Sequence, residues 1–153
     1  MMLNALKKIA AVSLLLTLGG CAGFGSGNGT YGESVVADPD TVSKLAGDAA
    51  RRLAIELPPA QTVLAVDAQY PAGPFATSLA EQLRLLGFGV DLCIAPCLPS
   101  GGSTHLRYLV AAIGQDGYRV TLSLPAAVVT RAYVKTSEGL QFASVWTRGE
   151  WVQ

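Results

Sequence analysis

The sequence TVLAVDAQYPAGPFATSLAEQLRLLGFGVDLCI at residues 62–94 has the pattern of a strand, a helix and a second strand. Residues 62–66 are a short apolar run bounded by turn formers, which indicates a buried strand. Ala72-Gly73-Pro74 begins a helix that ends at Gly87. One face of this helix is apolar and carries Phe75, Leu79, Leu83 and Leu86. Residues 88–94 form the second strand, and if the two strands lie in one sheet they should be parallel with a right-handed connection.

A further helix is predicted upstream, from Asp38-Pro39-Asp40 to the Pro58-Pro59 pair. Asp38 is suited to the N-cap, Pro39 to the first helical position and Asp40 to the first turn. The apolar stripe of this helix comprises Val42, Leu45, Ala46, Ala49, Leu53 and Leu57. The charged residues lie largely off that stripe, and they are Lys44, Asp48, Arg51 and Arg52.

Downstream of residue 103 the pattern is that of an antiparallel meander of three or four strands. The expected strands cover residues 105–113, 118–124, 128–135 and 140–146, with a short segment at 150–152. Gln115-Asp116-Gly117 and Ser137-Glu138-Gly139 supply the turns. The prediction is one α+β domain at residues 38–153, with two helices packed on one face of a small mixed sheet in the order α-β-α-β-β-β-β.

The composition restricts the classes of function. The chain has 153 residues, of which 50% are hydrophobic and 14% charged, enough for one domain with a real core. Its 11 basic and 11 acidic residues balance, whereas a protein that binds nucleic acid directly needs a basic patch. A single histidine excludes most histidine-based catalytic or metal sites within one chain. We therefore expect no enzymatic activity, no metal and no cofactor.

The first twenty residues are predicted to be a lipoprotein signal peptide. Lys7 and Lys8 precede a short apolar run, which is too short to span a bilayer. Leu18-Gly19-Gly20-Cys21 then matches the bacterial lipobox, in which the cysteine thiol takes a diacylglycerol and becomes the N-acylated first residue of the mature chain. The alternative is an ordinary signal peptide in which the position of Cys21 is accidental.

Residues 21–37 are predicted to be the lipidated cysteine and a glycine-rich tether. The sequence AGFGSGNGTYGESVVA at residues 22–37 contains five glycines, and a flexible segment of this length spans about 20–24 Å. Ala22 follows the cysteine in place of the aspartate that retains such lipoproteins in the inner membrane. The expected location is therefore the outer membrane, lipid-anchored and facing the periplasm.

Cys93 and Cys97 are the two cysteines that remain after lipidation, and an oxidising periplasm favours a small disulfide loop between them. Free thiols are the alternative. A zinc site would need two more ligands, for which only His105 and carboxylates are available. His105 itself is predicted to be a structural residue, and Asp67 a turn former, because no catalytic partner accompanies either at a useful spacing.

The aromatic residues near the end of the chain allow two interpretations. Leu140, Phe142 and Trp146 share one parity on a predicted strand, and Trp151 follows close to the terminus. Either these aromatics fill the core, or Trp146 or Trp151 lies on an exposed face that docks a partner, since tryptophan is enriched at interface hot spots.

Residues 38–153 resemble the TrbH family of conjugal transfer lipoproteins. The resemblance rests on LPPAQTVLAV at 57–66, FATSLAEQLRLLGFGV at 75–90 and YRVTLSLPAAVVTRAYV at 118–134, followed by a tryptophan-containing C-terminal strand. It implies a structural, anchoring subunit of a plasmid-encoded type IV secretion system, the apparatus of DNA transfer. The implied partners are the outer membrane and other core-complex subunits in a multimeric ring. The alternative is a periplasmic regulator or binding lipoprotein that acts on a cell-wall or envelope partner.

Overall fold

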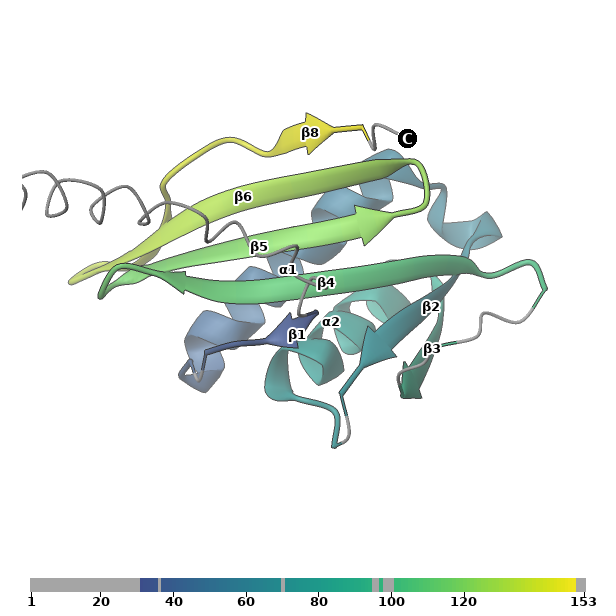
Figure 1. Ribbon diagram of the computed structural model, residues 1–153, viewed down its shortest axis with the longest axis horizontal. Helices are drawn as coiled ribbons and strands as arrows, with labels where there is room; N and C mark the ends of the chain where they lie inside the picture. Colours follow the sequence, from purple (N-terminus) through teal and green to yellow (C-terminus); the bar gives the residue numbers. More distant parts are fainter. Residues whose placement is uncertain (1–30, 36, 70, 95–96, 98–100, 151–153) are drawn as a thin grey trace, which may run out of the picture. The chain divides into compact units, whose positions relative to one another are not determined.

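The computed structural model describes residues 31–35, 37–69, 71–94, 97 and 101–150 (Figure 1). The chain from Tyr31 onward forms one compact unit. Its helices are α1 (Pro39–Glu56), the 3-10 helix η1 (Pro59–Gln61) and α2 (Pro74–Leu85). Its strands are β1 (Gly32–Glu33), β2 (Val63–Ala68), β3 (Gly89–Ile94), β4 (Thr104–Ile113), β5 (Gly117–Leu124), β6 (Ala127–Thr136), β7 (Gly139–Phe142) and β8 (Thr147–Gly149). Neither α-helix of the described part has the length and hydropathy of a transmembrane segment.

The strands form one mixed sheet in the order β3-β2-β4-β5-β6-β7, with β1 also beside β4 and β8 also beside β6. The pairs β2–β3, β2–β4 and β1–β4 are parallel, and the pairs from β4 to β8 are antiparallel. Both α-helices lie on the same side of this sheet (Figure 1). The predicted fold class is therefore confirmed.

The strand–helix–strand unit forms as its pattern predicts. β2 and β3 pair in parallel along their whole length, from Val63 opposite Gly89 to Ala68 opposite Ile94. α2 connects them and ends just before Gly87, whose φ of +95° lies in the left-handed region that favours glycine.

The core lies between the sheet and the two helices. α1 contributes its predicted stripe, with Leu45 and Leu53 fully buried, and α2 contributes Phe75, Leu79 and Leu83. The sheet supplies alternate residues of its central strands, since successive side chains of a strand point to opposite faces. These are Leu64, Val66, Leu106, Tyr108, Val110, Val120, Leu122, Val129 and Tyr133. Burial of this apolar surface is the main force that holds the helices on the sheet.

The N-terminus of α1 is capped as the sequence predicts, and the cap also joins α1 to the sheet. Asp38 accepts a hydrogen bond from the backbone N–H of Thr41 at 3.0 Å. Lys135 on β6 donates to the second oxygen of the same carboxylate at 2.6 Å. The hydrogen bond from Lys135 and those from Thr41 hold the pKa of Asp38 well below its usual range.

The structure differs from the predicted tether at its end. Gly32–Glu33 lie within the segment predicted as a flexible tether, but they form β1, which pairs in parallel with Leu109 and Val110 of β4. Ser34 donates from its backbone N–H and from its hydroxyl to the carbonyl oxygen of Val110, at 2.9 and 3.0 Å. A two-residue strand has no periodicity that a sequence pattern can reveal, so the domain begins earlier than Asp38.

The predicted strand at residues 140–146 is wrong as a single element. β7 and β8 both pair with β6, but the chain between them leaves the sheet. The backbone N–H groups of Ala143 and Ser144 both donate to the carbonyl oxygen of Ala132, at 3.0 and 3.3 Å, as in a bulge. This irregularity removes Trp146 from the strand. The segment predicted at 150–152 lies outside the described residues except for Glu150, which is not in a strand.

Candidate functional site

Asp67 and His105, from two neighbouring strands, meet on the face of the sheet that is turned away from the helices. Asp67 near the end of β2 lies directly opposite Cys93 near the end of β3, and Ala65 of β2 lies opposite His105 near the start of β4. Since Leu64 and Val66 point into the core, Ala65 and Asp67 point to the other face together with Cys93 and His105.

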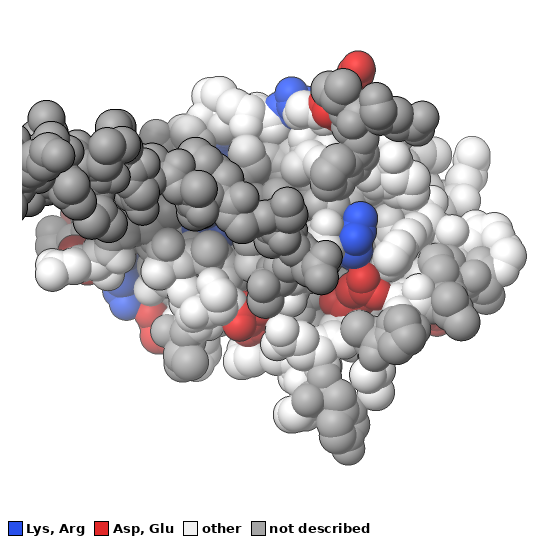
Figure 2. Space-filling model, in the orientation of Figure 1, with Lys and Arg blue, Asp and Glu red and all other residues white. Residues whose placement is uncertain are grey.

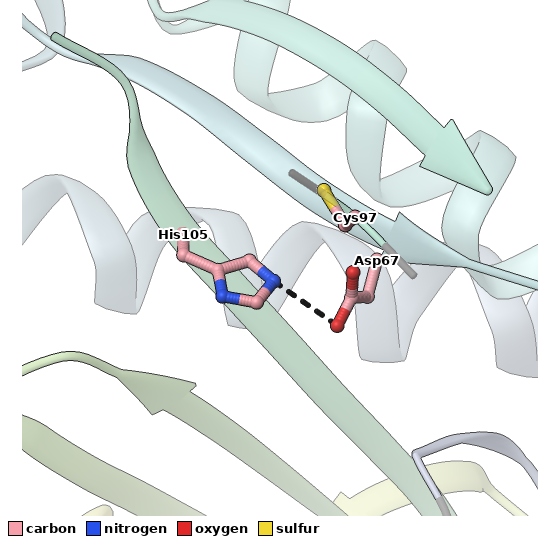
Figure 3. A group of neighbouring side chains, drawn as sticks. All are labelled: Asp67, Cys97 and His105. Atoms are coloured by element: carbon pink, nitrogen blue, oxygen red, sulfur yellow. Dashed lines mark ion pairs between the residues drawn. The ribbon is translucent and has the colours of Figure 1, made fainter. Parts of the chain in front are cut away.

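The carboxylate of Asp67 and the imidazole ring of His105 face each other (Figure 3). Asp67 Oδ2 and His105 Nε2 are 3.1 Å apart, and the side chains are 14% and 30% exposed. That separation is an ion-pair distance. Nε2 of His105 and Oδ1 of Asp67 are buried and have no hydrogen-bond partner among the described residues. Buried polar atoms without a hydrogen bond are uncommon in protein interiors, although Nε2 of His105 keeps its ion-pair contact with Oδ2 of Asp67.

Cys97 completes this group, which we name the Asp67–His105–Cys97 cluster. Its sulfur, one ring nitrogen of His105 and one carboxylate oxygen of Asp67 all lie within 4.8 Å of one another (Figure 3). The structure joins Cys97 to Cys93 in a disulfide, with their Cα atoms 5.4 Å apart, a normal separation for this bond. Asp67 is thus a residue of β2 and not a turn former, and His105 has a carboxylate neighbour that the spacing of the sequence did not show.

A second polar group is centred on Asp48 of α1. Its Oδ2 accepts hydrogen bonds from the hydroxyl of Tyr133 at 2.8 Å, from Arg131 Nη1 at 3.0 Å and from the indole N–H of Trp146 at 3.0 Å. Asp48 is 7% exposed, although the sequence set it off the apolar stripe of its helix. Burial and the hydrogen bond to Asp48 raise the pKa of Tyr133 far above its usual range. This network joins α1 to β6 and to the segment before β8.

The structure describes one of the two tryptophans for which core packing and docking were both considered. Trp146 is half-buried, packs against the core and donates its indole N–H to Asp48. Trp151 lies outside the described residues, as do Cys21 and the lipobox residues Leu18, Gly19 and Gly20.

A third set of polar contacts joins residues 31–34, which include β1, to α2 and β4. The carboxylate of Glu33 accepts the backbone N–H groups of Phe75 and Ala76 at 2.9 and 3.2 Å, at the positive N-terminus of α2. Gly73 permits this approach, because a Cβ there would overlap the Glu33 carboxylate. The guanidinium of Arg107 on β4 lies 4.2 Å from the ring centroid of Tyr31, the residue before β1.

Charged side chains of both signs are interspersed on the visible face of the sheet, where the described residues can be seen (Figure 2). This agrees with the balance of 11 basic and 11 acidic residues in the chain. Three polar groups of the described residues are considered below: the Asp67–His105–Cys97 cluster, the network of hydrogen bonds to Asp48, and the Glu33 carboxylate at the N-terminus of α2.

The model of one protein family, conjugal transfer protein TrbH, matches residues 25–150. No curated protein and no solved structure matches the chain significantly. The match begins upstream of the resemblance seen in the sequence, and it includes β1 and every later element through β8. Since it spans well over half of the sequence, the chain belongs to the TrbH family of conjugal transfer proteins.

Proposed function

We propose that this conjugal transfer protein is an outer-membrane lipoprotein that acts as an attachment subunit of the type IV secretion apparatus. The family makes it a component of the transfer machinery. The lipobox at residues 18–21 would supply the membrane attachment through acyl chains on Cys21. In this proposal the protein contributes position and contact, without catalysis or direct binding of DNA.

The observation that supports this role best is the way in which Tyr31–Ser34 are fastened to the domain. Only nine residues lie between Cys21 and Tyr31, so tension from a lipid anchor would reach β1 first. β1 pairs with the central strand β4, and Glu33 fixes it to α2. The load would therefore pass into both layers of the domain, which suits a subunit that holds an assembly at a membrane.

The partners in this proposal are the outer membrane and other subunits of the secretion core complex, arranged as a multimeric ring. Copies of the protein around a ring would multiply weak individual contacts, because each bound copy raises the effective concentration of the next. The interface itself would then need only modest area for each copy.

Replacement of Cys21 by serine tests the anchor. The wild-type chain is expected to incorporate labelled palmitate and to fractionate with the outer membrane, together with other secretion subunits after gentle detergent extraction. Cys21→Ser is expected to lose the label, the fractionation and those subunits. The double variant Cys93→Ser/Cys97→Ser is the matched control and should retain the label. A Cys21→Ser protein that still fractionates with the outer membrane would refute the lipid anchor, and capture of a cell-wall synthase in place of secretion subunits would favour the regulator alternative.

Removal of the Glu33 carboxylate tests the fastening of β1. Glu33→Ala leaves two N–H groups of α2 without their charged acceptor, and such a hydrogen bond contributes about 1.5 kcal/mol or more. We expect hydrogen exchange at the Ser34 amide, which donates to Val110, to accelerate about tenfold. Glu138→Ala in the β6–β7 turn is the control and should leave this amide unchanged. Equal exchange in Glu33→Ala and the wild type would show that the cap does not hold β1.

A further inference from the structure

We propose that the Asp67–His105–Cys97 cluster, together with Cys93, is a zinc site that becomes available when the Cys93–Cys97 disulfide is reduced. The ligands would be two thiolates, one imidazole nitrogen and one carboxylate oxygen. These are the donor types that zinc takes in four-coordinate protein sites. The proposal is independent of membrane attachment and of the secretion role.

The geometry brings the donors close to the required arrangement. The Cys97 sulfur and the nearest donor atoms of Asp67 and His105 lie within 4.8 Å of one another. Ligand atoms around a tetrahedral zinc ion are roughly 3.3–3.8 Å apart, which follows from bond lengths of about 2.0–2.3 Å. Small side-chain rotations would close that difference. Cys93, opposite Asp67 on the same face of the sheet, would supply the fourth ligand.

The two atoms of the cluster that make no hydrogen bond also favour a cation as the ligand. His105 Nε2 and Asp67 Oδ1 are buried without a hydrogen-bond partner among the described residues. A divalent cation would coordinate both atoms, with His105 as neutral imidazole and Asp67 as carboxylate. A cation at this position would therefore give Asp67 Oδ1 a partner and would replace the contact between His105 Nε2 and Asp67 Oδ2 by coordination.

The disulfide controls the site because the sulfur atoms can coordinate zinc strongly only as thiolates. A dithiol reductant would transfer two electrons and two protons, which breaks the S–S bond, yields two thiols on Cys93 and Cys97 and leaves the reductant as a disulfide. Zinc would then bind both sulfur atoms and release their two protons. The zinc ion would thus replace the disulfide as the link between Cys93 and Cys97 at the end of β3. Through Asp67 and His105 it would also link these cysteines to β2 and β4.

Cobalt binding tests the proposal, since Co²⁺ is a coloured substitute for Zn²⁺ in thiolate sites. The full chain carrying Cys21→Ser, which removes the third thiol, is reduced with a phosphine under anaerobic conditions and titrated with Co²⁺. We expect one equivalent to bind with thiolate-to-cobalt charge-transfer absorption, and Zn²⁺ to displace it. The oxidised chain should give no such absorption.

Variants identify the ligands. His105→Ala and Asp67→Asn are each expected to weaken Zn²⁺ binding to the reduced chain at least tenfold, measured by competition with a chromophoric chelator. Asp91→Asn is the matched control, because Asp91 lies on β3 two residues before Cys93 and should not change the affinity. Unchanged affinity in both His105→Ala and Asp67→Asn would reduce the site to two thiols and overturn the proposal, as would equal binding by the oxidised chain.

A further variant keeps the test valid if the reduced chain loses its fold. Cys93→Ser cannot form the disulfide, so it presents Cys97, His105 and Asp67 without any reductant. We expect Zn²⁺ to raise the unfolding temperature of Cys93→Ser, and this rise to disappear in Cys93→Ser/His105→Ala. Absence of any zinc-dependent stabilisation in Cys93→Ser, with no cobalt absorption in the reduced chain, would refute the site.

Discussion

Replacing Asp48 by alanine is expected to lower the free energy of unfolding by about 3–5 kcal/mol. Its carboxylate accepts hydrogen bonds from Arg131, Tyr133 and Trp146, and the Arg131 side chain is only 15% exposed. Without Asp48, the guanidinium would remain largely buried and would lose a charged partner. The phenol and indole donors would lose their acceptor as well, which adds to the cost.

Urea unfolding followed by circular dichroism measures this loss as a lower midpoint at an unchanged slope. Asp40→Ala is the matched control on the same helix, because Asp40 is exposed in the first turn of α1. It should change the free energy of unfolding by about 0.5 kcal/mol or less. Equal losses in the two variants would show that the hydrogen bonds to Asp48 add nothing beyond an ordinary helix position.

Asp48 also shows what helical periodicity can and cannot predict. The stripe of apolar residues on α1 was predicted correctly, since Leu45, Ala49 and Leu53 are all buried. Asp48 flanks that stripe by about 60° around the helix axis, three residues after Leu45. A charged residue at such a flank is usually exposed. Its burial depends on donors from β6 and from the segment before β8, which no local pattern of α1 contains.

The Asp67–His105 pair was not predicted, because a local sequence pattern does not reveal the order of the strands in a sheet. β4 follows β3 along the chain, yet β2 lies between them in the sheet. Only that order brings Asp67 beside His105. The four candidate zinc ligands were visible as residue types, but the sequence offered no reason to bring the carboxylate of Asp67 to the single histidine.

The first and last strands of the domain also depend on contacts with distant parts of the chain, which local sequence patterns cannot predict. β1 is held by Glu33 and Ser34 through contacts with α2 and β4, so its existence depends on elements far along the chain. At the other end, the alternation of Leu140 and Phe142 correctly indicated a strand. The bulge after Phe142 depends on the carbonyl oxygen of Ala132 accepting two N–H groups, which alternation cannot predict.

Replacing Phe75 by alanine is the second change with a large expected effect. Phe75 is 1% exposed at the beginning of α2, and its ring is stacked at a tilt against Tyr108 of β4, with centroids 5.2 Å apart. Alanine would lose this contact and leave a cavity between α2 and the sheet. Substitutions of this kind cost about 3–5 kcal/mol, which we expect as the loss in the free energy of unfolding measured in urea.

Leu85→Ala provides the matched control, since Leu85 is on the same helix but 79% exposed, and it should change the stability by about 0.5 kcal/mol or less. Phe75 also donates its backbone N–H to Glu33, so a shift of the α2 N-terminus would loosen β1. We therefore expect faster hydrogen exchange at Ser34 in Phe75→Ala than in Leu85→Ala. If Phe75→Ala destabilised the domain but left the Ser34 amide as protected as in the control, the core and the fastening of β1 would be independent, and tension on β1 would not be shared with the helical layer.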